Sequence, residues 1–555
     1  MKSSNRRTIK IILISTAVIS SLWIFWLSLT PVIDRDALRF HLSFAKLWAE
    51  NGFLYFRPHF AFYDLNMLNL NYLYMLVFKF GLPDQLTKVI HASFLIAGSC
   101  LIFKYFKDKY GFNWGAISFL MYITIPVHQR LASEVYVDLG LLFFSTLSII
   151  YFIKWFETDF AVRKYLIISA IGAGLAFGTK YNGMITAFFL TLFVGLVLTR
   201  RKRPDITVLR SMGLYALIIF LCASPWLIRN FINSGNPFFP LFTNIIPSSL
   251  TMPEALVENV TGETAYRVVG SGDGIIKLFL LPLRVFFEGR DNDLLRFDGV
   301  LNPFILIFSL FAFIKGPVYQ KRKKILRYIS ALFVVAFLTT LYSNNIRIRY
   351  FISLFPLLIF LNIEGLRNLY YAKRTQKYKP LVLLLIPLYL SFNIVYAADY
   401  FQKIKLNELN PFSKNSKENY LKEHLHGYKI YSYINSNTPQ NSVIYEAMNG
   451  GRSYYVDRTY YCDTSAIDRY LLELIQKGAS KEEYREHFSN LPNSELSATH
   501  LIFSPERFID AFKNIQSGDK SEGQEVLKSK IRGLADFLNE LKILAADDNL
   551  YLFKL

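Results

Sequence analysis

The sequence has little cysteine and little charge, and each shortage excludes a class of protein. Its three cysteines among 555 residues are Cys100, Cys222 and Cys462. They are too few and too far apart for a disulfide framework or for a Cys-x-x-Cys metal site. Only 19% of the residues are charged, whereas a soluble globular protein has about a quarter. An ordinary soluble protein is therefore a poor description of the chain.

Negative charge is scarcer than positive charge. The chain has 62 Lys and Arg against 42 Asp and Glu, which gives a formal net charge of +20. A soluble protein with this excess would suggest nucleic-acid binding, but that requires a basic folded domain, and none is visible here. The basic residues lie in short loops between apolar runs, as in the cytoplasmic loops of membrane proteins. We expect no nucleic-acid partner.

Long apolar runs are what the sequence has in abundance, since 52% of its residues are hydrophobic. Runs near the length of a bilayer crossing predict about eleven spans. They cover roughly 11–30, 86–105, 114–128, 136–155, 165–179, 182–199, 208–228, 299–316, 325–343, 350–366 and 380–398. The first run is too long for a signal peptide and no cleavage site follows it.

The loops predict the orientation of these spans. Alternate loops carry the basic stretches "KYFKDK", "TRRKRP", "KGPVYQKRKK" and "YAKRTQKYK", all on the side of the N-terminus. The positive-inside rule makes that side cytoplasmic, so an odd number of spans puts the tail outside. We therefore expect a multi-pass protein of a bacterial-type cytoplasmic (inner) membrane, with a cytoplasmic N-terminus.

Composition divides the chain near residue 400. Residues 1–400 form the predicted transmembrane domain, with long outer loops at 31–85 and 230–298. The first of these loops begins with an amphipathic helix that ends at Gly52. Residues 401–555 are polar, and strand patterns such as "NSVIYEA" alternate with helical patterns such as "AIDRYLLELIQKG" and "KIRGLADFLNELKIL". We predict a polytopic α-helical membrane protein with a C-terminal extracytoplasmic α/β domain.

Ionisable residues gather on the predicted outer face. A charge beside the bilayer is costly, so such residues suggest function. Together with one tyrosine they are Asp34, Asp36, Glu134, Asp138, Lys180, Arg347, Arg349 and Tyr350. A carboxylate can act as a general base toward a hydroxyl group, and Arg and Lys can bind a phosphate. The combination predicts group transfer from a lipid phosphate, with the cations stabilising the departing charge.

Structural roles compete with these functional ones. Asp36 could stabilise the start of a helix as a cap or first-turn acid. For Asp34, a role as a cap or a solvated loop acid has the same support as a functional role. Asp138 could pair with a nearby basic residue. Arg347 and Arg349 could anchor the chain at the membrane interface by snorkelling.

Four residues are weaker candidates for contact with a substrate: His41, Glu134, Arg57 and Tyr350. For His41 a structural role has slightly more support than a catalytic one. For Arg57, in "FRPHF", packing at the membrane interface is the better explanation.

Five stretches of the sequence, in order, resemble GT-C superfamily glycosyltransferases. The similar branch is the bacterial one related to protein O-mannosyltransferases and lipid A aminoarabinose transferases. The stretches are "DRDALRFHLSFAKLWAENG" (34–52), "YVDLGLLFF" (136–144), "GLAFGTKYNG" (174–183), "SPWLIRNFINSGNPFFPLF" (224–242) and "RIRYFISLFPLL" (347–358). The resemblance covers about 25–400.

The resemblance implies a catalytic cavity that faces outward and a polyprenyl-phosphate-linked sugar donor. It implies that Asp36 is the base or orients the acceptor, and that Asp138 is the second acidic position. Lys180, with the arginines, would hold the donor phosphate. Protein O-mannosyltransferases carry Asp-Glu at the first position, where this chain has Asp34-Arg35-Asp36; the "ALRFHL" that follows favours Asp36 over Asp34.

The predicted function is therefore an inverting glycosyltransferase that moves a sugar from a polyprenyl phosphate, such as undecaprenyl phosphate, to an acceptor hydroxyl. The acceptor could be a lipid, a glycan or a protein, and membrane lipids surround the chain. The sequence establishes no cofactor and no metal site. A divalent cation is an open alternative, since the acidic residues could act either with a bound cation or without one.

Two other functions fit part of the sequence. A transporter or flippase of lipid-linked sugars would place charges inside the spans and consist of two related halves, and neither feature is visible. A polysaccharide polymerase or ligase would use arginines in a large outer loop, for which Arg284, Arg290 and Arg296 are available.

Overall fold

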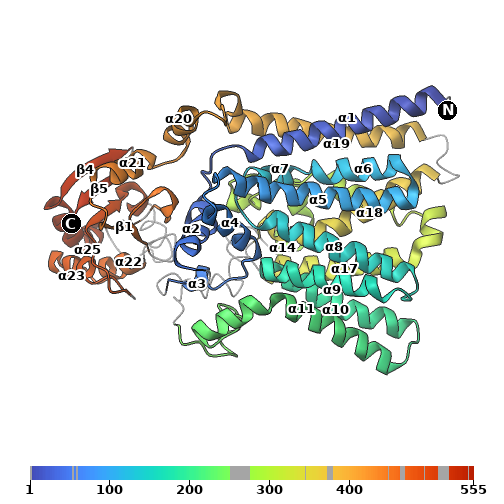
Figure 1. Ribbon diagram of the computed structural model, residues 1–555, viewed down its shortest axis with the longest axis horizontal. Coiled ribbons are helices and arrows are strands. Elements are labelled where there is room, and N and C mark those ends of the chain that lie inside the picture. The colour runs from blue at the N-terminus through green and yellow to red at the C-terminus, as the bar shows by residue number, and fades with distance from the viewer. Residues whose placement is uncertain are drawn as a thin grey trace. The chain divides into compact units, whose positions relative to one another are not determined.

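The apolar segments of the sequence form long helices in the computed structural model (Figure 1). The structure describes residues 3–52, 55–57, 61–250, 275–343, 346–371, 379–447, 449–462, 469–492, 494–509, 524–547 and 549–555. The part of the outer loop at 251–274 lies outside the described residues.

The chain divides into two compact units. Unit 1 comprises Met1–Thr30, Asn66–Leu73 and Pro83–Asn407, and unit 2 comprises Pro31–Leu65, Tyr74–Leu82 and Glu408–Leu555. The second unit thus contains most of the first outer loop together with the polar tail.

Unit 1 is helical. Its α-helices are α1 (Ser3–Ser28), α5 (Gln85–Tyr110), α6 (Phe112–Ile123), α7 (Pro126–Ala132), α8 (Asp138–Glu157), α9 (Arg163–Thr179), α10 (Asn182–Arg200), α11 (Asp205–Ser234), α14 (Ile275–Phe279), α15 (Leu281–Phe287), α16 (Phe304–Phe311), α17 (Pro317–Ser343), α18 (Phe355–Tyr371) and α19 (Lys379–Lys403). Short 3₁₀ turns lie at Leu294–Arg296 and Ile348–Leu354.

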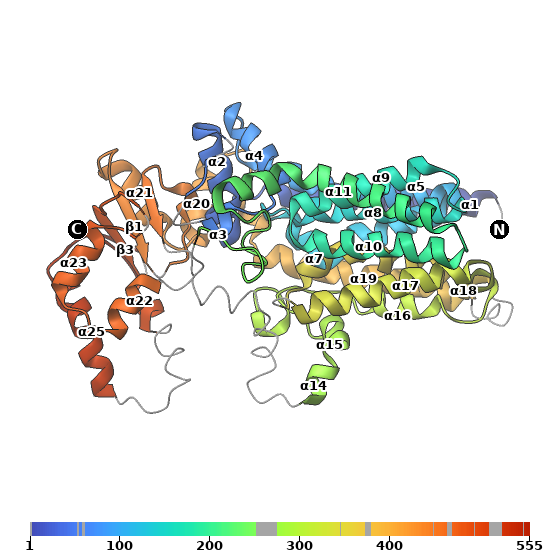
Figure 2. The ribbon, with the colours of Figure 1, turned by 90° about the horizontal axis from the view of Figure 1, so that it is seen from below.

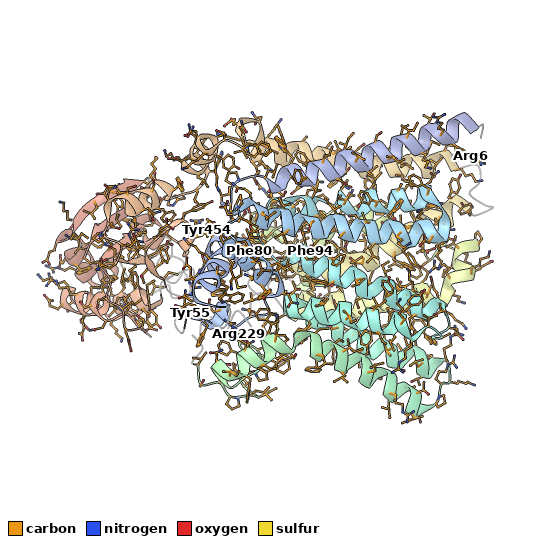
Figure 3. The ribbon with its side chains drawn as sticks, viewed as in Figure 1. Arg6, Tyr55, Phe80, Phe94, Arg229 and Tyr454 are labelled. Carbon is orange, nitrogen blue, oxygen red and sulfur yellow. The ribbon has the colours of Figure 1, made fainter. Side chains whose placement is uncertain are left out.

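The predicted membrane class is confirmed. Within the described residues, eight helical segments are long and apolar enough to cross a membrane. Each of the other three expected spans falls on a shorter helix, namely α6, α9 or α16. The long helices run alongside one another (Figures 1 and 2). Arg6 on α1 and Arg229 on α11 lie toward opposite ends of this bundle (Figure 3).

Two glycines let helix α9 pack closely on its neighbours. A Cβ atom at Gly174 would lie 2.7 Å from Cβ of Cys222 on α11, and one at Gly178 would lie 2.7 Å from Nδ2 of Asn69. Asn69 itself donates to the Leu175 carbonyl oxygen at 3.1 Å and accepts from Nε1 of Trp226 at 2.7 Å. It therefore joins the start of α4 (Asn69–Lys79) to α9 and α11.

Unit 2 begins with the predicted amphipathic helix. It consists of a π-helical turn at Ala37–His41 and α2 (Leu42–Asn51), and it ends at Gly52 with a φ of 91°. The short α3 (Ala61–Asp64) follows. The positive φ explains the glycine at this helix end.

The tail of unit 2 is the predicted α/β fold. Its helices are α20 (Lys414–His424), α21 (Tyr428–Asn437), α22 (Arg469–Gln476), α23 (Lys481–Ser489) and α25 (Gln524–Asn539). Its strands are β1 (Val443–Ala447), β2 (Thr459–Cys462), β3 (His500–Phe503), β4 (Lys542–Asp547) and β5 (Leu550–Lys554). The sequence did not predict β2, and "KIL" after α25 begins strand β4 although its apolar pattern continues that of the helix.

The sheet has the order β2-β1-β3-β5-β4. Strand β1 is parallel to β2 and β3, while β5 is antiparallel to β3 and β4. Alternate residues of β1 enter different cores: Tyr445 packs with α22, α23 and α25, and Ile444 packs with α21. Helices therefore cover both faces, and the ends of the parallel strands are left to the loops.

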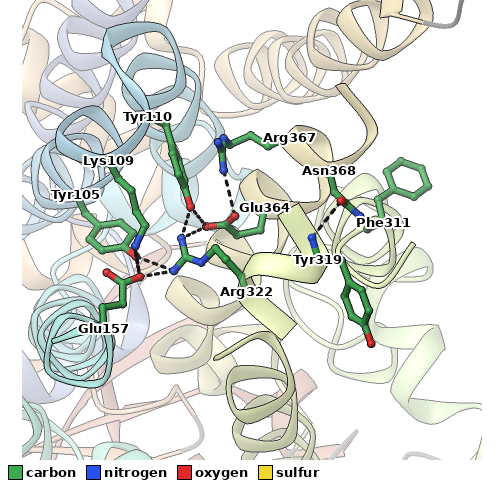
Figure 4. A network of polar contacts seen from close by, with 10 residues as sticks. All are labelled: Tyr105, Lys109, Tyr110, Glu157, Phe311, Tyr319, Arg322, Glu364, Arg367 and Asn368. Carbon is green, nitrogen blue, oxygen red and sulfur yellow. Dashed lines mark hydrogen bonds and ion pairs between the residues drawn. The ribbon is translucent and has the colours of Figure 1, made fainter. Parts of the chain in front are cut away.

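A buried ionic network ties four helix ends of unit 1 together (Figure 4). Arg322 on α17 binds Glu364 of α18 at 2.5 Å and also pairs with Glu157 of α8. Tyr110 of α5 donates to Glu364 at 2.7 Å, and Arg367 binds the same carboxylate at 3.3 Å. The ends of α5 and α8 and the start of α17, which border basic stretches of the sequence, consequently meet at one end of the bundle, as their charge pattern predicts.

We expect Glu364→Ala to lower the thermal unfolding midpoint of the purified protein sharply. Glu364 is 0% exposed, so its removal leaves Arg367 without its carboxylate and Arg322 with Glu157 alone. Loss of one partner from a buried pair costs about 3–5 kcal/mol. The control is Asp108→Ala, since Asp108 belongs to the exposed pair with Lys104 at the same end of α5. Equal midpoints for the two variants would contradict a stabilising role for the network.

Candidate active site

The end of unit 1 opposite this network contains a second group of charges, built from helix termini. Asp138 is the first residue of α8, where the helix dipole favours an acid. Lys180 follows the last residue of α9, and its extended backbone ends that helix. Nζ of Lys180 lies 2.8 Å from Oδ1 of Asp138, whose side chain is 1% exposed. The ion pair that the sequence left open for Asp138 is therefore present.

Three cations surround the ring of Tyr350. Its centroid lies 5.1 Å from Nζ of Lys180, 5.6 Å from Cζ of Arg349 and 6.0 Å from Cζ of Arg347. Arg347 precedes the 3₁₀ turn that leads into α18, and Arg349 lies within it. We call these four residues and Asp138 the Tyr350 cluster. The structure thus brings together predicted residues from three distant segments of the chain.

Histidine 91 fixes the start of α8 beneath this cluster. The Leu139 amide donates to Nε2 of His91 at 3.0 Å, so Nδ1 carries the proton and lies 2.9 Å from the Glu134 carbonyl oxygen. Because both ring nitrogens bind backbone atoms, the position of Asp138 is set by α5 as well as by α8.

A neighbouring group is centred on Arg130 of α7. This guanidinium binds Glu134 at 2.9 Å, Asp298 at 2.8 Å and Asp291 at 3.3 Å. Arg347 reaches the other oxygen of Asp298 at 3.8 Å and so connects the two groups. We call Arg130 and its three acids the Arg130 cluster. Glu134, predicted to contact substrate, is engaged here in an ion pair.

The Arg130 cluster alters the acidity of its members. Burial by itself would raise the pKa of the Asp298 carboxyl, but the positive charges of Arg130 and Arg349 outweigh burial and hold that pKa below its ordinary value. Asp298 is therefore ionised at neutral pH and can keep Arg130 and Arg347 in place.

The remaining predicted residues belong to unit 2. Asp36 occupies the N-cap position of the π-helical turn but makes no side-chain capping hydrogen bond. Asp34 lies near Tyr420 of the tail and, by its charge, adds to the effect of burial in raising the pKa of that phenol. His41 ends the π-helical turn. Arg57 is bound to Asp64 at 2.9 Å within the loop, which agrees with a structural role.

Sequence reasoning missed several charged residues of both units. Arg130 stands just after an apolar run, and nothing in its own surroundings indicates three acidic partners. In unit 2 it missed Arg39, which is 1% exposed, and Arg452, which follows Gly450 and Gly451 at the end of β1. The Gly-Gly-Arg after a strand was the available signal.

Metal binding finds no support in the described part of the chain. There, no group of three or more His, Cys, Asp or Glu side chains could hold an ion. The predicted option of a divalent cation stays a prediction.

A protein family matches the region that contains both clusters of unit 1. The family described as a domain of unknown function, DUF8201, covers residues 74–356. The chain belongs to the DUF8201 family. No curated protein matches the sequence.

Solved structures resemble this member of the DUF8201 family over nearly its whole length. ArnT from Cupriavidus metallidurans bound to undecaprenyl phosphate is 12% identical, covers 98% of this chain and 97% of its own, and has a TM-score of 0.58. The apo state of ArnT gives 13% identity and the same TM-score. The Archaeoglobus fulgidus oligosaccharyltransferase in complex with Zn and sulfate is 12% identical, with coverage of 97% and 73% and a TM-score of 0.53. The chain therefore has the predicted GT-C fold.

We expect Lys180→Met to destabilise the protein and a second substitution, Asp138→Asn, to restore most of the loss. The single change leaves the buried Asp138 carboxylate without its ammonium partner, whereas the double change removes both charges. The cost of the single change should fall at the lower end of about 3–5 kcal/mol, since the Lys180 side chain is 22% exposed.

Thermal unfolding of the two single variants and the double variant measures this coupling. Lys104→Met, at an exposed position of α5, is the matched control. Strictly additive losses from Lys180→Met and Asp138→Asn would show that the pair contributes nothing to stability.

Proposed function

We propose that this protein is an integral-membrane glycosyltransferase that transfers a sugar from a polyprenyl-phosphate donor to an acceptor hydroxyl at the outer face of the cytoplasmic membrane. The observation that carries the proposal is the Tyr350 cluster. Three cations and one carboxylate from separate segments meet at one end of a helical bundle. Such a group of cations suits a phosphate ester at the membrane surface.

The GT-C fold supports the same function. ArnT, whose fold is similar over nearly the full chain, is described in a complex with undecaprenyl phosphate. A lipid phosphate is the ligand that the Tyr350 cluster is chemically suited to hold. Both arguments lead to undecaprenyl phosphate, or a related polyprenyl phosphate, as the carrier of the sugar.

In the proposed reaction the acceptor oxygen attacks the anomeric carbon from the side opposite the phosphate. A bond forms between that oxygen and carbon, the bond between the carbon and the phosphate oxygen breaks, and the configuration inverts. Lys180, Arg347 and Arg349 stabilise the charge that develops on the departing polyprenyl phosphate. Asp138 holds Lys180 in position, as their 2.8 Å contact suggests.

The proton of the acceptor hydroxyl passes to Asp36 in this proposal. Asp36 directly precedes the π-helical turn, and the resemblance to GT-C glycosyltransferases gives this position the role of the base. Asp34, two residues earlier, is the other candidate. A positioned general base contributes about 10²–10⁴-fold to such a reaction. The proposed acceptor is an oxygen nucleophile of a lipid, a glycan or a protein.

We expect purified wild-type protein to release undecaprenyl phosphate with time from one member of a panel of radiolabelled undecaprenyl-phosphate sugars. Asp36→Asn should slow this release by about 10²–10⁴-fold, because the amide cannot accept the proton. Asp205→Asn, in the first turn of α11, is the control and should leave release unchanged.

Two other outcomes would redirect the assignment. Movement of the labelled lipid across a proteoliposome membrane without bond cleavage, unchanged in Asp36→Asn, would indicate a transporter. A triple variant with Asp36→Asn, Asp34→Asn and Lys180→Ala is also measured against the wild type. Unchanged release of undecaprenyl phosphate would show that neither the proposed base nor the proposed phosphate-binding lysine is needed for the activity.

The proposed orientation can be measured with single cysteines on a background in which Cys100, Cys222 and Cys462 are replaced by serine. A membrane-impermeant maleimide should label Arg532→Cys, in helix α25, in intact cells. It should label Lys202→Cys, in the basic loop between α10 and α11, only after permeabilisation. The reverse pattern would place the tail in the cytoplasm and contradict the proposed reaction face.

A further inference from the structure

A second group of arginines lies within unit 2, at the carboxyl ends of the parallel strands. Arg35 lies in the loop after α1, and Arg39 lies in the π-helical turn that follows it. Arg452 follows β1, and Arg507 follows β3. With the buried Glu446 at the end of β1 they form what we call the strand-end cluster. None of these residues takes part in the reaction proposed above.

The topology of the sheet makes this place a natural binding site. Strands β1 and β3 are adjacent and parallel, but after β1 the chain turns to β2 on one side, and after β3 it leads to β4 and β5 on the other. In open α/β sheets, ligands bind in the crevice that such diverging connections leave beyond the strand ends. Arg452 lies in the loop after β1, and Arg507 lies in the helical segment at 505–509 that follows β3.

Asparagine 449 holds these two arginines side by side. Nη1 of Arg507 donates to Oδ1 of Asn449 at 2.9 Å, and Nη1 of Arg452 donates to its carbonyl oxygen at 3.3 Å. Asn449 is 0% exposed and donates in turn to the hydroxyl of Tyr431 at 2.9 Å. The two guanidinium groups are thus positioned by a neutral amide.

The glycines after β1 leave room for the other two arginines. A Cβ atom at Gly450 would lie 2.8 Å from Nε of Arg35, and one at Gly451 would lie 3.0 Å from Nε of Arg39. Nε of Arg35 also donates to the Gly450 carbonyl oxygen at 3.3 Å. Both glycines have positive φ, 90° and 73°, so this loop is shaped for close approach of the guanidinium groups.

Positive charge is in excess in the strand-end cluster. Glu446 is 2% exposed; its Oε1 accepts from the Gly451 amide at 2.6 Å, and no hydrogen bond reaches its Oε2 within the residues described. Burial and then the like charge of Arg39 lower the pKa of Arg35, and burial and then Arg452 lower the pKa of Arg507. Asp36 acts on Arg35 and Glu506 acts on Arg507, so three carboxylates, Glu446 included, face four guanidinium groups. The remaining positive charge leaves room for an anion.

We infer that the strand-end cluster binds an anionic group, a phosphate or a carboxylate, of the acceptor. The identification of the ligand as the acceptor rests on the proposed function, whereas the binding of an anion does not. Arg452 and Arg507 supply two guanidinium groups suited to a phosphate or carboxylate, and Arg35 and Arg39 add charge from the segment after α1. The anion could come from an acidic saccharide or from the headgroup of a membrane lipid.

The test uses full-length protein in phosphatidylcholine nanodiscs, titrated calorimetrically with glucose 1-phosphate and with glucose. It is performed on the Asp138→Asn/Lys180→Met background, which lacks the proposed donor lysine. Glucose 1-phosphate should bind at least about tenfold more tightly than glucose, and Arg452→Gln or Arg507→Gln should each weaken its binding about tenfold. Arg532→Gln, on the exposed face of α25, should change nothing.

Glu446→Gln should change the affinity for glucose 1-phosphate in the opposite direction from the arginine variants. It retains an acceptor for the Gly451 amide but removes the one buried negative charge, so glucose 1-phosphate should bind about threefold or more tightly than before. No discrimination between the two sugars, or an unchanged affinity in all three variants, would overturn the inference. Anion binding that persists while transfer is absent in every assay would keep this site and reject only the proposed function.

Nanodiscs that contain phosphatidylglycerol distinguish the two sources of the anion. If they compete with glucose 1-phosphate in the parent protein but not in Arg452→Gln, the site takes a lipid headgroup. If they do not compete, it takes an acidic saccharide from solution. Either result supports an anion site at the strand ends.

Discussion

The cost of placing a charge in a low-dielectric environment organises unit 1. Its long helices carry few charges along their lengths, and the charges they do carry collect at the two ends of the bundle in paired groups. At one end Arg322 joins α8, α17 and α18 through Glu157 and Glu364. At the other end Lys180 and Asp138 join α8 to α9. Each group joins two or more helices by ion pairs, so specific polar contacts hold the ends of the bundle in addition to apolar packing.

The two ends of the bundle differ in how their charged side chains are arranged. In the network around Arg322, the acids and bases contact one another directly, and Glu364 is fully enclosed. In the Tyr350 cluster, Lys180, Arg347 and Arg349 face one aromatic ring, and the carboxylate of Asp138 binds Lys180 at 2.8 Å. The acids that balance Arg347 belong to the Arg130 cluster, with Asp298 at 3.8 Å. The direct pairing of acids and bases around Arg322 fits a structural role, whereas the three cations gathered in the Tyr350 cluster are the basis of the proposed phosphate site.

Much of the fold could be predicted because helices and spans depend on residues that are close together in the sequence. Apolar run length predicted the helices of unit 1, and basic loops predicted which helix ends lie together. Strand β2 was missed because "TYYC" is only four residues long and polar tyrosines dominate it. The start of strand β4 was predicted to be helical because "ELKIL" continues the apolar spacing of α25. The grouping of the first outer loop with the tail could not be predicted, since hydrogen bonds such as that from Tyr455 to the carbonyl of Val32 join residues 423 positions apart.

Only those residues of the candidate site that border predicted membrane spans could be predicted from the sequence. Lys180, Arg347 and Arg349 stand out because they border apolar runs, and the structure brings them together around Tyr350. Arginines of a polar domain carry no such signal, because charged residues are ordinary there. Arg452 and Arg507 are distinguished by the strand order, because the segments after β1 and β3 begin side by side and then lead to opposite sides of the sheet. Strand order depends on pairing between distant segments, so a charge-rich site built on it becomes visible only in three dimensions.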